Sequence, residues 1–169
     1  LTADEVAAMS DTLMVKEFTE ARTGSTGANS ITINTPAGTV EDDLLIAAVT
    51  IRGKKTASSL KTPPGEGWTN IYIGNKGLNV TLGAWWKLAD KSESTSHQFT
   101  WKDNPEESYA WMIRLAGHDI SDPIDAYEAR KGNLAEPFVA PITTTVDGCL
   151  ILRMGGFTDD DIIADDPGL

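Results

Sequence analysis

The chain has 169 residues, of which 40% are hydrophobic and 23% charged, and its formal net charge is −11. A chain of this length fits one large domain or a domain with an arm, and its apolar fraction excludes wholesale disorder. Nucleic acids and anionic membranes are bound through Lys and Arg, so the acidic charge argues against both as partners. The sequence also contains no apolar stretch of membrane-spanning length.

The first 28 residues are expected to form an N-terminal arm that ends in a flexible loop. Thr2 and Glu5 have the spacing of a helical capping box, which predicts a short helix over residues 2–13. Residues 14–20 either end this helix or form a first strand, and residues 23–30 are rich in Gly, Ser and Thr, as loops are. The arm is too apolar for a free tail, so we expect it to contact neighbouring subunits. Its apolar side chains include Val6, Met9, Leu13 and Phe18.

Runs rich in β-branched and aromatic residues then alternate with clusters of Gly, Pro, Asn, Ser and Thr. The runs cover residues 30–34, 43–52, 68–73, 78–87, 97–102 and 109–116. Residues 44–49 are apolar at every position, which predicts a central strand buried on both faces. Two more strands are expected over residues 138–146 and 148–154, joined by a tight turn at Asp147 and Gly148.

These runs predict an all-β fold, an antiparallel β-sandwich of the jelly-roll or immunoglobulin-like type, with a helical or extended N-terminal arm. The sandwich domain is expected to cover residues 29–169. Cys149 is the single cysteine, and within its apolar run it is interpreted as a small core residue, since no internal disulfide can form. The other residues expected to be buried are Leu44, Ile46, Val49, Trp111, Ile113, Leu150 and Leu152.

Trp85 and Trp86 are adjacent on one predicted strand, so their side chains point to opposite faces. Trp86 shares its face with Leu82, whereas Trp85 shares the more polar face with Thr81 and Gly83. This pattern predicts that Trp85 is the more exposed of the two. An exposed Trp either stacks on a sugar or lies at a subunit contact.

The histidines and acidic residues match no catalytic or metal-binding motif. His97 and His118 are interpreted as ordinary strand and loop histidines, and His118 with Asp119, Asp122 and Asp125 is the best metal-like group. A second acidic cluster near the C-terminus lacks the EF-hand order, so a solvated loop is favoured over a Ca²⁺ site. The Ca²⁺ candidates in this cluster are Asp159, Asp161 and Asp165. No catalytic residue and no other cofactor is expected.

The order of several short motifs adds a resemblance. They are Asn34–Gly38, the acid pair Asp42 and Asp43 before Leu44–Val49, Pro63–Trp68, Leu82–Lys87, Phe99–Trp101, Gly117–Asp119, Pro123–Asp125, Thr143–Thr145 and Gly148–Leu152. Over about residues 30–156 this order resembles a β-sandwich module of phage virion proteins (tail, decoration or fibre components) and of secreted bacterial surface proteins. Such modules usually continue past an acidic loop into one or two further strands, so the resemblance implies that the domain lacks its last strand or strands here.

The expected function is therefore that of a non-enzymatic structural or interaction subunit of a virion or other extracellular assembly. The resemblance and the acidic, strand-rich composition support this interpretation, and it predicts a homo-oligomer or contacts with other particle subunits. The alternative is a carbohydrate-binding module that holds a surface glycan through Trp85. The first predicts a large assembly, and the second a monomer with an open aromatic platform.

Overall fold

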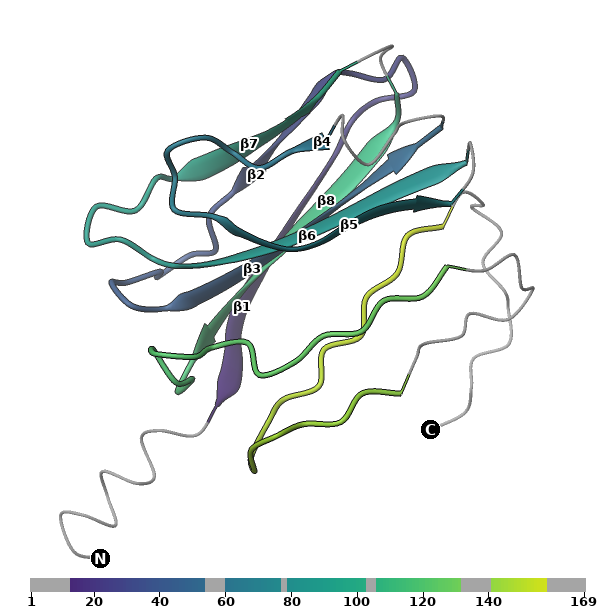
Figure 1. Ribbon diagram of the computed structural model, residues 1–169. Coiled ribbons are helices and arrows are strands. Elements are labelled where there is room, and N and C mark those ends of the chain that lie inside the picture. Colours follow the sequence, from purple (N-terminus) through teal and green to yellow (C-terminus); the bar gives the residue numbers. More distant parts are fainter. Residues whose placement is uncertain (1–12, 54–59, 77–78, 103–105, 132–140, 158–169) are drawn as a thin grey trace, which may run out of the picture.

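The computed structural model describes residues 13–53, 60–76, 79–102, 106–131 and 141–157. Within these ranges the chain forms eight β-strands and no helix, and the strands make two antiparallel sheets that face each other (Figure 1). The predicted all-β sandwich is confirmed. The helix expected over residues 2–13 lies outside the described residues except for Leu13.

The larger sheet has five strands in the order β1-β8-β3-β6-β5, and the smaller has three in the order β2-β7-β4. The strands are β1 (Met14–Arg22), β2 (Ser30–Asn34), β3 (Leu44–Arg52), β4 (Leu60–Lys61), β5 (Thr69–Lys76), β6 (Val80–Leu88), β7 (Ser96–Trp101) and β8 (Ser108–Ala116). Six of them match predicted runs to within a few residues. Strand β4 was not predicted from the sequence, because two residues are too few to show a period.

The pairing of the strands follows the jelly-roll scheme. Strand β1 pairs with β8, β2 with β7 and β3 with β6, as in one long antiparallel hairpin that is rolled into two sheets. The rolled hairpin brings β3 beside β8 and β4 beside β7. The one departure is β5, which pairs with β6 and so extends the larger sheet to five strands.

The main core fills the space between the sheets. From β3 it takes Leu45, Ala47, Val49 and Ile51, all at most 1% exposed. Alternation then points Leu44 and Ile46 to the outer face of the larger sheet, where they are also buried. Strand β3 is thus the central strand buried on both faces that its unbroken apolar run predicted.

The described part of the expected arm belongs to the sandwich. Strand β1 pairs with β8 from Met14 to Arg22 and forms one edge of the larger sheet. The proposed boundary between an arm of residues 1–28 and a domain of residues 29–169 is therefore wrong over β1. The sequence was compatible with either a helix or a strand in this segment. Pairing with the distant strand β8 stabilises the strand.

The outer face of the larger sheet is covered by chain that is not β-structure. Residues 117–131 and 141–157 cross this face as extended segments outside any strand (Figure 1). Ile124 and Met154 pack there against a buried cluster that includes Ile46 and Ile113. The two sheets and this covering make three layers in the order small sheet, large sheet and C-terminal covering.

The two strands expected at the C-terminus are wrong within the described residues 141–146 and 148–154. The turn at Asp147 and Gly148 is present, with Gly148 at φ +78°. Leu150 and Leu152 are 47% and 37% exposed, which corrects their prediction as core. The segment lies across a sheet face and not along a sheet edge, so its backbone cannot join a ladder.

Candidate functional site

Trp85 lies in the main core and not on the surface, which corrects the prediction that it is the exposed tryptophan. It is 0% exposed, whereas Trp86 is partly buried on the outer face of the larger sheet. The alternation count was right, but the polar-looking face of β6 is the inner one. Gly83 leaves space for the indole ring, and Thr81 is itself fully buried. The Trp85 Nε1–H donates to Thr62 Oγ1 over 2.8 Å, so its polar atom is satisfied.

The same inner face carries a buried lysine that sequence reasoning missed. Lys87 is 3% exposed, and its Nζ lies 2.9 Å from Glu93 and 3.0 Å from Asp90. Burial alone would lower the pKa of Lys87, but the hydrogen bonds and charges of Glu93 and Asp90 outweigh it and raise the pKa above its ordinary value. Lys87 is two residues from Trp85, so the two side chains must lie on the same face of β6. This spacing indicates a buried lysine only once Trp85 is known to be buried.

His97 on β7 continues this buried cluster. Its side chain is fully buried, with Nδ1 2.5 Å from Glu66 Oε2 and Nε2 3.1 Å from Glu93 Oε1. The second contact lacks the geometry of a hydrogen bond. Trp68 also directs its Nε1–H at Nδ1 over 3.2 Å, so the tautomer decides whether Nδ1 accepts from Trp68 or donates to Glu66. The cluster ties the loop before β5 and the loop before β7 to the core.

These groups do not form a metal site. The carboxylates of Glu66 and Glu93 contact opposite nitrogens of one imidazole, so they do not converge on a common point. No group of three His, Cys, Asp or Glu side chains within the described ranges is arranged to hold a metal ion. A buried, mutually paired cluster of this kind holds loops in place.

A second charged group lies at the start of β3. Asp43 is 7% exposed, accepts the Val40 N–H over 2.9 Å and lies 3.5 Å from Nη1 of Arg114. His118 follows β8, and both of its ring nitrogens are buried without a partner among the described residues. Burial lowers the pKa of His118, and the charges of Asp43, Asp42 and Asp119 oppose this effect only in part.

The acidic residues beside His118 do not gather around it. Asp119 accepts the Ser121 N–H over 2.7 Å, and Asp125 binds Thr145 in the covering layer. The most metal-like group in the sequence, His118 with Asp119, Asp122 and Asp125, is therefore not arranged around a metal position within the described residues. The Ca²⁺ candidates Asp159, Asp161 and Asp165 lie outside the described residues, as do Val6 and Met9 of the predicted arm.

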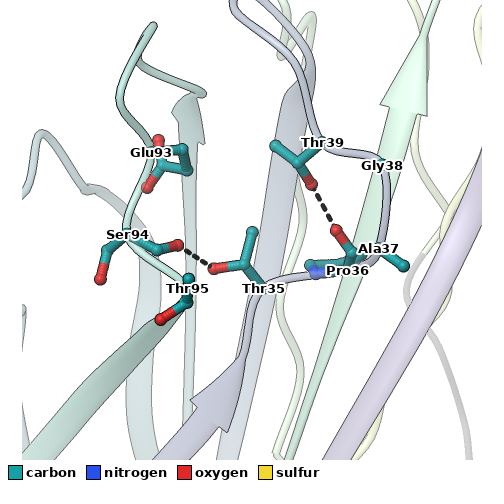
Figure 2. Close-up of a pocket in the computed structure, with 8 residues that line it drawn as sticks. All are labelled: Thr35, Pro36, Ala37, Gly38, Thr39, Glu93, Ser94 and Thr95. Carbon is teal, nitrogen blue, oxygen red and sulfur yellow. Dashed lines mark hydrogen bonds between the residues drawn. The ribbon is translucent and has the colours of Figure 1, made fainter.

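A shallow hollow of about 250 Å³ opens between the loop after β2 and the loop before β7 (Figure 2). Thr35 Oγ1–H donates to the Ser94 carbonyl over 2.5 Å, and Thr39 Oγ1–H donates to the Pro36 carbonyl over 2.7 Å. The hydroxyls of Thr35, Thr39 and Ser94 at its wall are thus engaged within the protein. Ligand pockets are usually larger, apolar and lined by a few free polar groups, so the hollow defines no ligand.

Asp125 links the two halves of the covering layer. Its carboxylate accepts the Thr145 N–H over 2.8 Å and also bonds the Thr145 hydroxyl. These hydrogen bonds, from side chain and backbone, hold the pKa of Asp125 below its ordinary value. Cys149 lies 3.8 Å from the same carboxylate, and burial together with this negative charge raises the pKa of the thiol.

Among the described residues, most of the large apolar side chains that are exposed lie in this covering layer. We call those in residues 141–157 the C-terminal band, and it consists of Val146, Leu150, Ile151, Leu152 and Phe157, which are 37–62% exposed. A second exposed group lies on the edge strand β1, where Met14, Val15 and Phe18 are 42–51% exposed. Of the predicted arm residues, Phe18 is therefore on the surface, whereas Leu13 packs partly against the outer face of the sheet.

The comparisons with known proteins add no further assignment. No family model matches the chain, and neither the curated proteins nor the solved structures searched gave a match. In the described ranges there is also no helix long and apolar enough to cross a membrane.

Proposed function

We propose that the chain is a non-enzymatic structural or interaction subunit of a virion or other extracellular assembly. The observation that carries this proposal is the C-terminal band. Three of its residues, Leu150, Ile151 and Leu152, are consecutive and are 47%, 56% and 37% exposed. Exposed apolar side chains that form one surface are typical of protein contacts, and these three follow one another along the chain.

Two further observations support a structural role. The buried side chains of Lys87 and Glu93 and the half-buried Arg114 are directed at protein partners inside the fold, as groups that hold loops and sheets together are. The jelly-roll pairing is also an arrangement that capsid and lectin domains use, which is an analogy of fold and not of site. The partners of this proposal are copies of the chain or other subunits of the same particle.

The carbohydrate-binding alternative has lost its main residue. It depended on an exposed Trp85, and this indole is enclosed between Phe99, at a ring distance of 4.8 Å, and the rest of the core. A glycan would need an open aromatic face.

The test is the mass of the native full chain, measured by light scattering coupled to size exclusion and by electron microscopy. The proposal predicts an assembly, and Ile151→Asn in the C-terminal band should reduce its mass. Val40→Asn is the matched control, since Val40 is 62% exposed but lies outside the band. Strictly monomeric protein at all concentrations, or equal effects of both variants, would contradict the proposal.

A further inference from the structure

The turn at Asp147 and Gly148 joins residues 141–146 to residues 149–157 in the covering layer. These two residues make the only Asp-Gly step of the sequence, which has no Asn-Gly step. Glycine has no side chain to shield its backbone nitrogen, so this nitrogen can attack the carboxyl group of the preceding aspartate. An Asp-Gly step is for this reason the aspartate step most prone to rearrange through a cyclic imide.

The surroundings of this turn leave both reacting groups accessible. Asp147 and Gly148 are exposed, and a methyl group at Gly148 would meet no atom within 4 Å apart from its chain neighbours. Within the described residues, no hydrogen bond engages the Asp147 carboxylate or the Gly148 N–H. The turn also lies outside both sheets, so its backbone can rotate into a reactive geometry without breaking a ladder.

The rearrangement needs no co-reactant apart from water. The Gly148 nitrogen bonds to Cγ of Asp147, and the proton of the nitrogen leaves with the hydroxyl of the carboxyl group as one water, which closes a five-membered succinimide ring. Water then opens the ring at one of its two carbonyl carbons. Opening at Cγ restores aspartate, whereas opening at the α-carbonyl leaves the main chain running through Cγ, as isoaspartate. The mass of the chain is unchanged, because the water lost is regained.

From these observations we propose that residue 147 is a site of spontaneous isoaspartate formation, and that the altered turn loosens the covering layer. Isoaspartate adds one methylene group to the main chain between Val146 and Gly148. Sγ of Cys149 lies 3.4 Å from the Val146 carbonyl on the other side of the turn and 3.8 Å from Asp125. Both contacts depend on the length of the turn. The reaction requires no partner subunit, so it does not depend on the proposed function.

Asn29 offers a comparison within the same chain. It precedes Ser30, and an asparagine followed by a small residue cyclises readily in an unfolded peptide. In the fold its carbonyl accepts the Trp101 N–H over 3.0 Å, and Ser30 lies in β2 opposite Thr100. The Ser30 nitrogen can attack only after this part of the sheet opens. An opening free energy of about 1.4 kcal/mol already slows such a reaction about tenfold.

Ageing of the full chain at neutral pH tests the site. Digestion and electron-transfer fragmentation measure the isoaspartate fraction at residue 147, which should exceed the rearranged fraction at residue 29 by at least about tenfold. In water enriched in heavy oxygen, each ring opening should also add a heavy oxygen atom to residue 147. Asp147→Glu is the matched control, since it keeps the charge but would have to close a less favourable six-membered ring.

Alkylation of Cys149 tests the loosening of the covering layer. In the aged wild type, Cys149 should react faster with iodoacetamide than in the fresh protein, and the gain should be proportional to the isoaspartate fraction. The reason is that the thiol moves away from the Asp125 carboxylate, which helps to raise its pKa. Aged Asp147→Glu protein should react at the same rate as the fresh variant.

The two measurements separate the two parts of the proposal. An isoaspartate fraction at residue 147 no higher than the rearranged fraction at residue 29 would overturn the site. Isomerisation at residue 147 with a constant alkylation rate of Cys149 would overturn the loosening of the covering layer. Neither result depends on the mass of the native assembly, so the proposed function stands or falls by its own test.

Discussion

The indole of Trp85 occupies the space that a side chain at Gly83 would need. A methyl group at Gly83 would lie well inside van der Waals distance of the Trp85 ring and 2.8 Å from Cδ2 of Leu60. Gly83 and Trp85 are two residues apart on β6, so they are neighbours on its inner face. The largest side chain of the core therefore depends on the absence of a side chain beside it.

Gly83→Ala should for this reason destabilise the sandwich by about 1–3 kcal/mol, since overpacking a filled core has costs of that size. Urea unfolding measures the change. Gly24→Ala is the matched control, because a methyl group there would meet no atom within 4 Å. Equal unfolding free energies for the two variants would show that Trp85 moves aside without strain.

Lys87→Met should destabilise the fold by about 3–5 kcal/mol, because it leaves the buried Glu93 without its cation. Glu93 is 7% exposed, so water does not replace the lost partner. Glu107→Gln weakens the exposed pair between Glu107 and Arg52 and should have an effect below about 1 kcal/mol. Chemical unfolding of both variants gives the comparison, and a small effect at Lys87 would contradict a structural role for the cluster.

The stability of the protein should fall on acidification in a way that depends on His118. Its pKa in the folded chain is lowered by burial, whereas in the unfolded chain it is about 6.5. As the pH falls through about 6.5, the unfolded chain binds a proton that the folded chain does not, so the stability is complete above this pH and declines below it. The decline ends below the folded pKa.

His118→Gln should remove this part of the pH dependence. The unfolding free energy of the wild type relative to this variant should be lower at pH 5.5 than at pH 7.5. A difference that stays constant with pH would mean that Asp42, Asp43 and Asp119 offset the burial of His118 completely.

Cys149 should react slowly with alkylating reagents at pH 8, because burial and the Asp125 carboxylate raise the pKa of its thiol. Asp125→Asn removes the negative charge and should speed up alkylation by iodoacetamide. Asp147→Asn is the control, since its charge contributes least to the same shift. Mass spectrometry of the time course measures the rates, and equal rates in both variants would contradict a role for Asp125.

The sequence predicted the sheets better than the surfaces. Strand β3 was recognisable because only a strand with cover on both faces has apolar residues at every position. Trp85 was predicted to be exposed because Thr81 and Gly83, which share its face of β6, look polar in the sequence. Lys87 lies on the same face and is buried as well. Their burial depends on partners from other elements, such as Glu93, and on a ring that fills the space over a glycine. The alternation of residues along one strand predicts neither the partners from other elements nor the ring over the glycine.

The C-terminal segment shows the same limit at the level of backbone. Residues 148–154 have the composition of a strand, but a strand requires a free edge that the chain can reach. The segment lies on the outer face of the larger sheet, so Met154 packs against the sheet while Ile151 remains 56% exposed. Composition alone does not distinguish these two placements.

The three-layer arrangement divides the five tryptophans into two optical groups. Trp68, Trp85 and Trp101 lie between the sheets, whereas Trp86 and Trp111 lie beneath the C-terminal covering. The covering is outside the strand ladders, so it can loosen while the sheets remain intact. Intrinsic fluorescence then separates the two events, because a red shift from Trp86 and Trp111 would precede the signal of the inner three. The chain therefore carries its own reporter for each side of the larger sheet.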